Sequence, residues 1–228
     1  MRALSELEEE LAIHFSDRSL LEKALRHKSY IMEQPEQGLE DNERLEFLGD
    51  SVLDLVISEY IYKAYQDHTE GDLAKIRAVV VSAPVLAGIA KTIALGSYIF
   101  LGRGEEISGG RKRENLLADT FEALIGAIYL DQGLEQARQF ILGNLEDEVQ
   151  AVEAGEHIHD FKTMLQEITQ KKYNTLPHYE VVKEEGPEHN KRFLVQVALE
   201  DKPLGQGQGT SKKEAEQRAA KEAVQELE

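Results

Sequence analysis

The stretch NERLEFLGDSVLDLVISEY, residues 42–60, has its apolar residues at helical spacing. At about 100° per residue, five of them share one arc and predict a core-facing side: Leu45, Leu48, Val52, Leu55 and Val56. The next arc, roughly 80° wide by the same geometry, contains four carboxylates: Glu43, Glu46, Asp50 and Asp54. We therefore expect a helix with a stripe of acids along the edge of its buried face.

A second pair of acids lies in ENLLADTFEALIGAIYL, residues 114–130. Asp119 and Glu122 are three residues apart, so they share one side of a helix with Asn115 and Gly126. The rest of this helix is strongly apolar, and we expect the acidic side to be half-buried. Gly126, with Ala123, would let a neighbouring helix approach closely.

Solvated acidic faces are the ordinary interpretation of such patterns. Like charges three and four residues apart destabilise a helix, however, and carboxylates in apolar surroundings cost more unless something compensates them. A divalent cation would compensate, and oxygen ligands without His or Cys favour Mg²⁺ or Mn²⁺ over zinc or copper. The Glu-x-x-His pairs of a di-iron bundle are missing here. The pattern favours metal-assisted phosphodiester chemistry.

The negative charge is distributed unevenly along the 228 residues. The formal net charge of -17 argues at first against nucleic acid, because phosphate binding requires Lys and Arg. Residues 1–157 carry 15 Lys and Arg against 30 Asp and Glu, whereas residues 158–228 carry 11 against 13. The two parts are expected to do different jobs.

The chain contains no cysteine, which excludes disulfides, zinc thiolates and thiol catalysis and favours a reducing cytoplasm. The N-terminal sequence MRALSELEEELAIHF is too acidic for a signal peptide, so we expect an unprocessed start. The most apolar stretch, Pro84 to Leu101, is interrupted by polar residues and suits a buried helix better than a membrane span.

The hydrophobic period changes near residue 153. Residues 1–152 are helical almost throughout, and we expect breaks at Gln34–Gly38, His68–Gly71, Pro84 and Gly102–Gly110. Residues 153–159 suit a linker. Residues 160–228 predict a helix (161–171), three strands (178–183, 193–199 and 203–208) and an Ala-rich helix (211–227). The fold class is an all-α domain joined to a small α-β-β-β-α domain.

Three segments of the first part closely resemble bacterial ribonuclease III: NERLEFLGDSVLD, EGDLAKIRAVVVS (residues 70–82) and GGRKRENLLADTFEALIGAIYLD. Together they cover most of residues 10–150. The resemblance implies a Mg²⁺-dependent endonuclease for double-stranded RNA, in which Mn²⁺ substitutes. It implies metal-binding carboxylates at Glu46, Asp50, Asp119 and Glu122, with Asp50 and Glu122 catalytic, and supporting acids at Glu43 and Glu70. All six are intact.

Phe47 falls outside the predicted apolar arc, where a monomer would expose it. In ribonuclease III this side forms a symmetric dimer, so Phe47 resembles an interface anchor. The resemblance also implies 5′-phosphate and 3′-hydroxyl ends with short 3′ overhangs, and processing of ribosomal RNA precursors, messenger RNA and transfer RNA. The basic segment Gly109–Arg113 is a candidate patch near the cleavage site, or a solvated loop.

The segment from Asp160 is similar to double-stranded-RNA-binding domains over its whole length, including FKTMLQEITQ, GPEHNKRFLVQV and GQGTSKKEAEQRAA. The resemblance implies three RNA contacts: a helix with Thr163, Gln166, Glu167 and Gln170, a loop with Pro187, Glu188 and His189, and a phosphate grip with Ser211, Lys212 and Lys213. The grip also has a physical basis. Ser211 suits an N-cap, and lysines in a first turn oppose the helix dipole unless a phosphate is bound there.

Two other classes of function compete with the endonuclease. One is a non-cleaving, double-stranded-RNA-binding regulatory protein whose nuclease domain serves for dimerisation. The intact carboxylate set argues against it. The other is an acidic helical scaffold, which explains neither block of acids. Double-stranded RNA and a second copy of the chain are the expected partners, and no membrane is expected.

Overall fold

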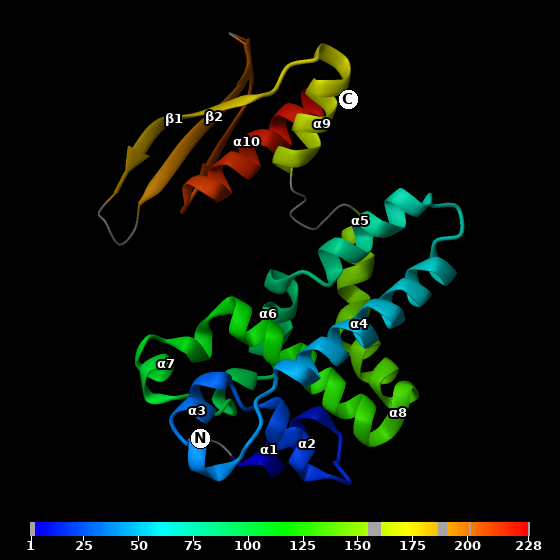
Figure 1. Cartoon of the computed structure of the whole chain (residues 1–228). Helices are drawn as coiled ribbons and strands as arrows, with labels where there is room; N and C mark the ends of the chain where they lie inside the picture. The colour runs from blue at the N-terminus through cyan, green and yellow to red at the C-terminus, as the bar shows by residue number, and fades with distance from the viewer. Residues whose placement is uncertain (1–2, 155–160, 187–190, 201, 228) are drawn as a thin grey trace. The chain divides into compact units, whose positions relative to one another are not determined.

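The chain divides into two compact units, Met1–Glu153 and Ala154–Glu228. The structure is a computed structural model that describes residues 3–154, 161–186, 191–200 and 202–227, apart from the side chains of 37, 163, 167 and 213 (Figure 1). The predicted fold class, a helical domain followed by an α-β-β-β-α domain, is confirmed. The exact domain bounds stay predictions, because most of the predicted linker lies outside the described residues.

The regular elements of the first unit are all helices among its described residues, and one isolated parallel β-bridge joins Arg26 and Phe100. Its α-helices are α1 (Leu4–Leu11), α2 (Arg18–Ala24), α3 (Lys28–Met32), α4 (Glu43–Ala64), α5 (Glu70–Val80), α6 (Ala83–Thr92), α7 (Arg103–Ile107) and α8 (Glu114–Glu153). Three 3-10 turns lie between them: η1 (Pro35–Gln37), η2 (Leu95–Ser97) and η3 (Gly110–Lys112).

Several predicted helix limits were wrong. The segment Gly102–Gly110, predicted as a break, contains α7. The helix predicted over 114–130 ends close to where it was expected, because α8 consists of two helices that meet at a kink at Gly133 (φ 84°, ψ -179°), but this break itself was not predicted. Pro84 lies in the first turn of α6, where a proline needs no N–H donor, and the break precedes it.

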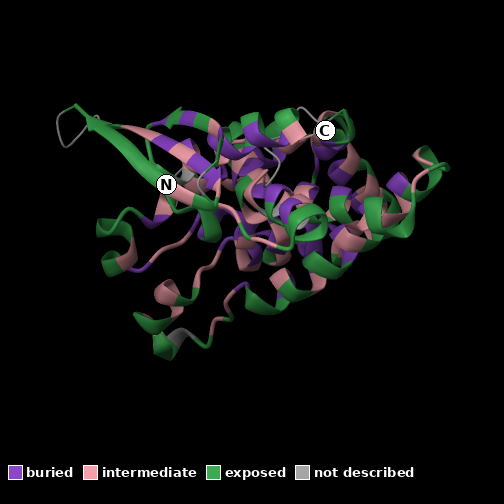
Figure 2. Cartoon of the chain, turned by 90° about the horizontal axis from the view of Figure 1, so that it is seen from above, coloured by how far each residue is buried: buried purple, intermediate pink, exposed green. Residues whose placement is uncertain are grey.

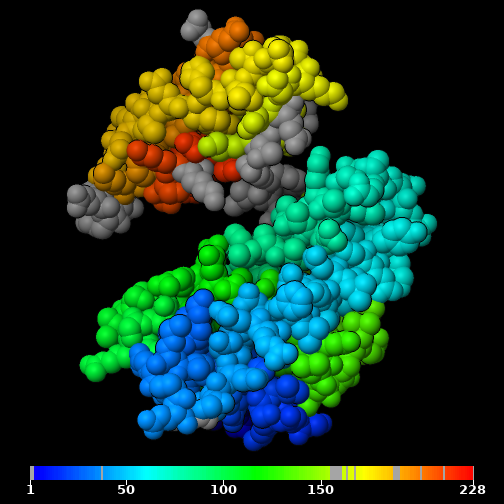
Figure 3. Space-filling view, in the orientation of Figure 1, coloured from blue at the N-terminus to red at the C-terminus, as the bar shows by residue number. Residues whose placement is uncertain are grey.

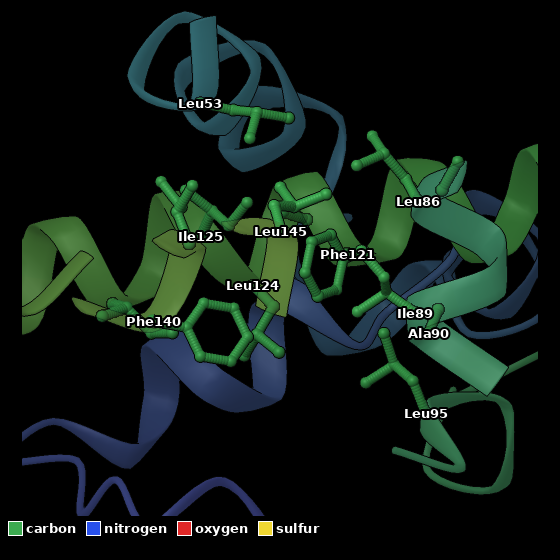
Figure 4. Close-up of a cluster of buried hydrophobic side chains, with 14 of the residues drawn as sticks. Leu53, Leu86, Ile89, Ala90, Leu95, Phe121, Leu124, Ile125, Phe140 and Leu145 are labelled. Carbon is green, nitrogen blue, oxygen red and sulfur yellow. The ribbon is translucent and has the colours of Figure 1, made fainter. Parts of the chain in front are cut away.

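The core of this unit forms where α4 and α6 pack on α8, with Leu53, Leu86 and Phe121 among the fully buried side chains (Figure 4). Leu55 was predicted to be in the core, but it is 53% exposed. The buried side of α4 is rotated toward Gly49 and Leu53, because α4 meets α8 through the small residue Gly49. Figure 2 shows buried residues on the inner faces of the helices.

The second unit is an antiparallel sheet with two helices on one face. Its strands, in the order β1-β2-β3, are β1 (His178–Glu185), β2 (Arg192–Leu199) and β3 (Lys202–Gly209). The helices α9 (Phe161–Tyr173) and α10 (Lys212–Leu227) pack together, and α10 covers β2 and β3 (Figure 1). The α10 backbone approaches very closely, since a β-carbon on Gly207 would lie 2.2 Å from the backbone nitrogen of Ala219.

No single helix among the described residues is long and apolar enough to cross a membrane. Among the described residues, only α5 and α6 taken together, across a 45° bend, reach the length and composition of a membrane span. Such a pair is weak evidence for a span, because the buried core helices of other proteins also reach that length and composition.

Candidate active site

The two predicted blocks of acids meet where α4 packs against α8. Glu46 of α4 and Asp119 and Glu122 of α8 each offer a carboxylate oxygen, and these oxygens lie within 4.8 Å of one another. We call these three residues the carboxylate cluster. Carboxylates that converge in this way, from two helices of one apolar core, repel one another unless protons or a cation intervene.

The electrostatics of the cluster reflect this crowding. Burial, followed by the charges of Asp50 and Glu46, raises the pKa of Glu122 to about 8. Burial and the charge of Asp119 raise the pKa of Glu46, and burial raises the pKa of Asp119. Without a cation, this site therefore retains protons near neutral pH. A hard divalent ion with oxygen ligands fits this donor set.

The other predicted acids, Asp50, Glu43 and Glu70, lie outside the cluster. Asp50 is exposed one turn after Glu46, and burial and the charge of Asp54 raise its pKa. Glu43 pairs with Lys28 at 3.1 Å and lines a small cavity with Glu46 and Asp119. Glu70, in the first turn of α5, instead lines a hollow with Ser58 and Tyr62.

Phe47 is 77% exposed on α4. Two further large apolar residues of this helix, Leu55 and Tyr62, are also exposed, at 53% and 72%. Their spacing of eight and seven residues puts all three on one side of α4. We call Phe47, Leu55 and Tyr62 the apolar stripe. The space-filling view shows α4 and α5, cyan to teal, at the surface of their unit (Figure 3).

The basic segment Gly109–Arg113 mostly braces its own surroundings. Arg111 donates to the carbonyl oxygens of Gly96 and Ile99, both at 2.8 Å, and pairs with Glu106. Arg113 pairs with Glu105 at 2.7 Å. Only the exposed Lys112 of the three basic residues has no ion pair among the described residues, so the segment is chiefly structural.

The second unit exposes several predicted RNA contacts. Gln166 and Gln170 are exposed on α9, on the side opposite the buried Leu165. The predicted N-cap is confirmed, because Ser211 Oγ accepts a hydrogen bond from the backbone N–H of Glu214 at 3.2 Å. Lys212 is exposed in the first turn of α10.

The remaining predicted contacts are outside what the structure describes. They are the side chains of Thr163, Glu167 and Lys213, and the loop residues Pro187, Glu188 and His189.

Sequence reasoning missed two neighbours of the cluster, His27 and Lys28. Both line the small cavity beside Glu46 and Asp119. Burial lowers the pKa of His27, whose Nδ1 lies 2.8 Å from Ser29 Oγ. No periodic signal marks these residues, since His27 caps the short helix α3 and Lys28 begins it, apart from either block of acids.

A helical unit with a metal-compatible carboxylate cluster, followed by an α-β-β-β-α unit, defines a class: nucleases with an attached RNA-binding module. A Ribonuclease-III-like family model matches residues 17–148, and a double-stranded RNA binding motif matches residues 161–227. The chain belongs to the ribonuclease III family and is a double-stranded-RNA-specific endoribonuclease.

Curated relatives match over nearly their whole length. Ribonuclease 3 of Fusobacterium nucleatum is 46% identical, covering 97% of this chain and 94% of the relative. Ribonuclease 3 of Caldanaerobacter subterraneus is 50% identical, covering 98% of each. The solved nuclease domain of ribonuclease III from Campylobacter jejuni is 41% identical, with a TM-score of 0.59, covering 64% of this chain and 97% of that domain.

Proposed function

We propose that the chain hydrolyses phosphodiester bonds of double-stranded RNA with Mg²⁺, or Mn²⁺ in its place, at the carboxylate cluster, leaving 5′-phosphate and 3′-hydroxyl ends. The observation that carries this proposal is the convergence of Glu46, Asp119 and Glu122 within 4.8 Å, with the pKa of Glu122 at about 8. These residues would hold the ion. A bound Mg²⁺ supplies an activated water and charge that offsets the phosphate.

The side chains of the site then orient the reaction. Asp50, exposed beside the cluster, accepts a proton from the water whose oxygen attacks phosphorus. The bond from phosphorus to the 3′ oxygen breaks, and that oxygen takes up a proton from a solvent water to leave as a hydroxyl. Glu122, the second proposed catalytic residue, is half-buried on α8.

We infer that two copies pair through the apolar stripe. In a two-fold interface the same surface is used twice, so two antiparallel α4 helices would meet near Leu55, halfway between Phe47 and Tyr62. The partner's Phe47 would then face the hollow of about 200 Å³ that Tyr62 and Glu70 line. This pairing would carry Glu70 toward the partner subunit's site, which accounts for its distance from the cluster in its own chain.

Ribosomal RNA precursors and other structured transcripts are the proposed substrates, because a module that reads duplex shape has little sequence preference of its own. The resemblance to ribonuclease III supports this choice. Cytoplasmic location, which the cysteine-free sequence favours, stays a prediction.

The test is incubation of a perfect RNA duplex with Mg²⁺, Mn²⁺, Ca²⁺ or a chelator, beside a DNA duplex and single-stranded RNA. We expect RNA duplex cleavage with Mg²⁺ and Mn²⁺. Ca²⁺ should support binding better than cleavage, because its longer and looser coordination positions the reactants less well. Cleavage with Ca²⁺ at the Mg²⁺ rate would contradict a strict octahedral site, and no cleavage with any divalent ion would overturn the proposal.

A further inference from the structure

A cavity of about 40 Å³ lies beside the carboxylate cluster, between α3, α4 and α8. Glu43, Glu46 and Asp119 line it, together with Lys28. Among the described residues that line this cavity, Lys28 is the one with a permanent positive charge. A hydrogen bond from Lys28 and its attraction to Glu43 raise the pKa of Lys28, so it stays protonated at working pH.

The pair between Lys28 and Glu43 does not hold either side chain firmly. Nζ and Oε1 are 3.1 Å apart, but the lysine side chain is 55% exposed and the glutamate 56%. Ion pairs this exposed contribute little to stability, because water solvates both ions well when they separate. The ammonium group can therefore turn toward another anion at little cost.

The substrate presents such an anion at this place. The scissile phosphate must approach several carboxylates, and its negative charge grows on the non-bridging oxygens as water attacks. The acids of the cluster cannot stabilise that charge themselves. A lysine is suited to do so, because its ammonium is a compact charge on a flexible stem.

We propose that Lys28 is a further catalytic residue, which exchanges its contact with Glu43 for a non-bridging oxygen of the scissile phosphate. This inference rests on the proposed function, because the proposed function places the scissile bond at the carboxylate cluster. Lys28 transfers no proton and forms no covalent bond. It contributes charge that is already in position when the phosphate enters.

The first experiment compares Lys28→Met with Lys28→Arg and with a matched control, Lys63→Met. Lys63 also forms an exposed pair with a glutamate, Glu59, but it lies 20 residues after Glu43 on α4, about 30 Å along the helix. Single-turnover cleavage with Mg²⁺ and duplex affinity in Ca²⁺ are measured for each protein.

We expect Lys28→Met to slow cleavage by about 10² to 10³ with affinity within about threefold of wild type, because one phosphate contact supplies little of duplex affinity. Lys28→Arg should retain part of the rate, and Lys63→Met all of it. If wild type cleaves and Lys28→Met cleaves equally fast, this inference is overturned while the proposed function stands. If wild type does not cleave with any divalent ion, both fall.

A second experiment separates a phosphate contact from a role in positioning Glu43. The substitution Lys28→Met is repeated in a Glu43→Gln background, where the carboxylate that pairs with the lysine is gone. A direct contact predicts the same fold-loss in both backgrounds. A loss that disappears in the Glu43→Gln background, or that excess Mg²⁺ fully restores, would show that Lys28 acts only through Glu43 or the metal, and would overturn the inference.

Discussion

Gly49 of α4 and Gly126 of α8 face each other where the two helices cross. A β-carbon on Gly49 would lie 1.8 Å from the carbonyl oxygen of Glu122, and one on Gly126 would lie 2.3 Å from the carbonyl oxygen of Leu45. Because neither residue has a side chain, the backbones of the two helices approach closely. That approach brings a carboxylate oxygen of Glu46 to within 4.8 Å of those of Asp119 and Glu122, so that the three could hold one ion.

We expect Gly126→Ala to impair both folding and cleavage. The added methyl group meets backbone rather than a movable side chain, so the helices must separate, at a cost of about 1–3 kcal/mol or more in the free energy of unfolding. A displacement of about 1 Å between the carboxylates can lower the rate by 10²-fold. Chemical denaturation and single-turnover cleavage measure the two effects.

Gly143→Ala is the matched control, in the part of α8 that follows the kink at Gly133. A β-carbon there meets nothing within 4 Å, so the substitution should raise stability by about 0.5–1 kcal/mol through helix propensity alone. Equal effects of the two substitutions would contradict the importance of the close crossing.

Periodicity predicted the elements that carry strong local signals. The acidic edge of α4, the closeness allowed by Gly126 and the alternating strands of the second unit all follow from the spacing of residues. The rotation of α4 could not be predicted from that spacing. Leu53 and Leu55 are both apolar, and only the position of α8 decides which one is buried. Tertiary contact settles what periodicity leaves open.

The candidate site was predicted only in part for a similar reason. Glu46, Asp119 and Glu122 stand on helices whose faces can be drawn from the sequence. Lys28 reaches the same cavity from α3, a five-residue helix with no buried residue and so no readable face. Glu70 lines a different hollow from the cluster of its own chain. A proposed contact between Glu70 and the site of a second subunit leaves no pattern in a single sequence.

Glu122→Gln should lower cleavage by orders of magnitude while duplex affinity holds. The substitution keeps the side-chain volume but removes a negative charge from the proposed metal site, and the proposed RNA contacts lie in the other unit. Gel shifts beside a cleavage assay measure both quantities. Loss of binding with metal present would contradict this division of labour.

The metal-free protein should become less stable as pH rises from about 4.5 to 8. Burial and neighbouring acids raise the pKa of Glu122 to about 8 in the folded state, from a usual 4.5, so between these values the folded state binds more protons than the unfolded state. The proton-linked stability is complete below pH 4.5 and is lost as pH rises through 8. Thermal melts with a chelator measure this trend, and Glu122→Gln should flatten it.

Phe47→Asp should weaken self-association with little effect on the folding of each subunit. The side chain is 77% exposed, so a charge there changes stability by about 0.5 kcal/mol or less, but it becomes costly if the stripe is desolvated between two copies. Ile107→Asp is the control, because Ile107 is also 77% exposed and lies on α7. Light scattering measures the mass of each protein in solution. A monomeric mass for the wild type at micromolar concentration would contradict the dimer.

Lys212→Ala combined with Lys213→Ala should weaken duplex binding in a salt-dependent way. Lys212 stands exposed in the first turn of α10, where the N-terminus of a helix capped by Ser211 favours an anion. Removing two phosphate contacts should lower the magnitude of the slope of log affinity against log salt by about 2 or somewhat less. Because the carboxylate cluster is untouched, cleavage should recover at low salt. A gel-shift series across ionic strength, run beside a cleavage assay, tests both statements, and a variant that binds RNA at low salt but stays inactive would show that these lysines do more than hold the duplex.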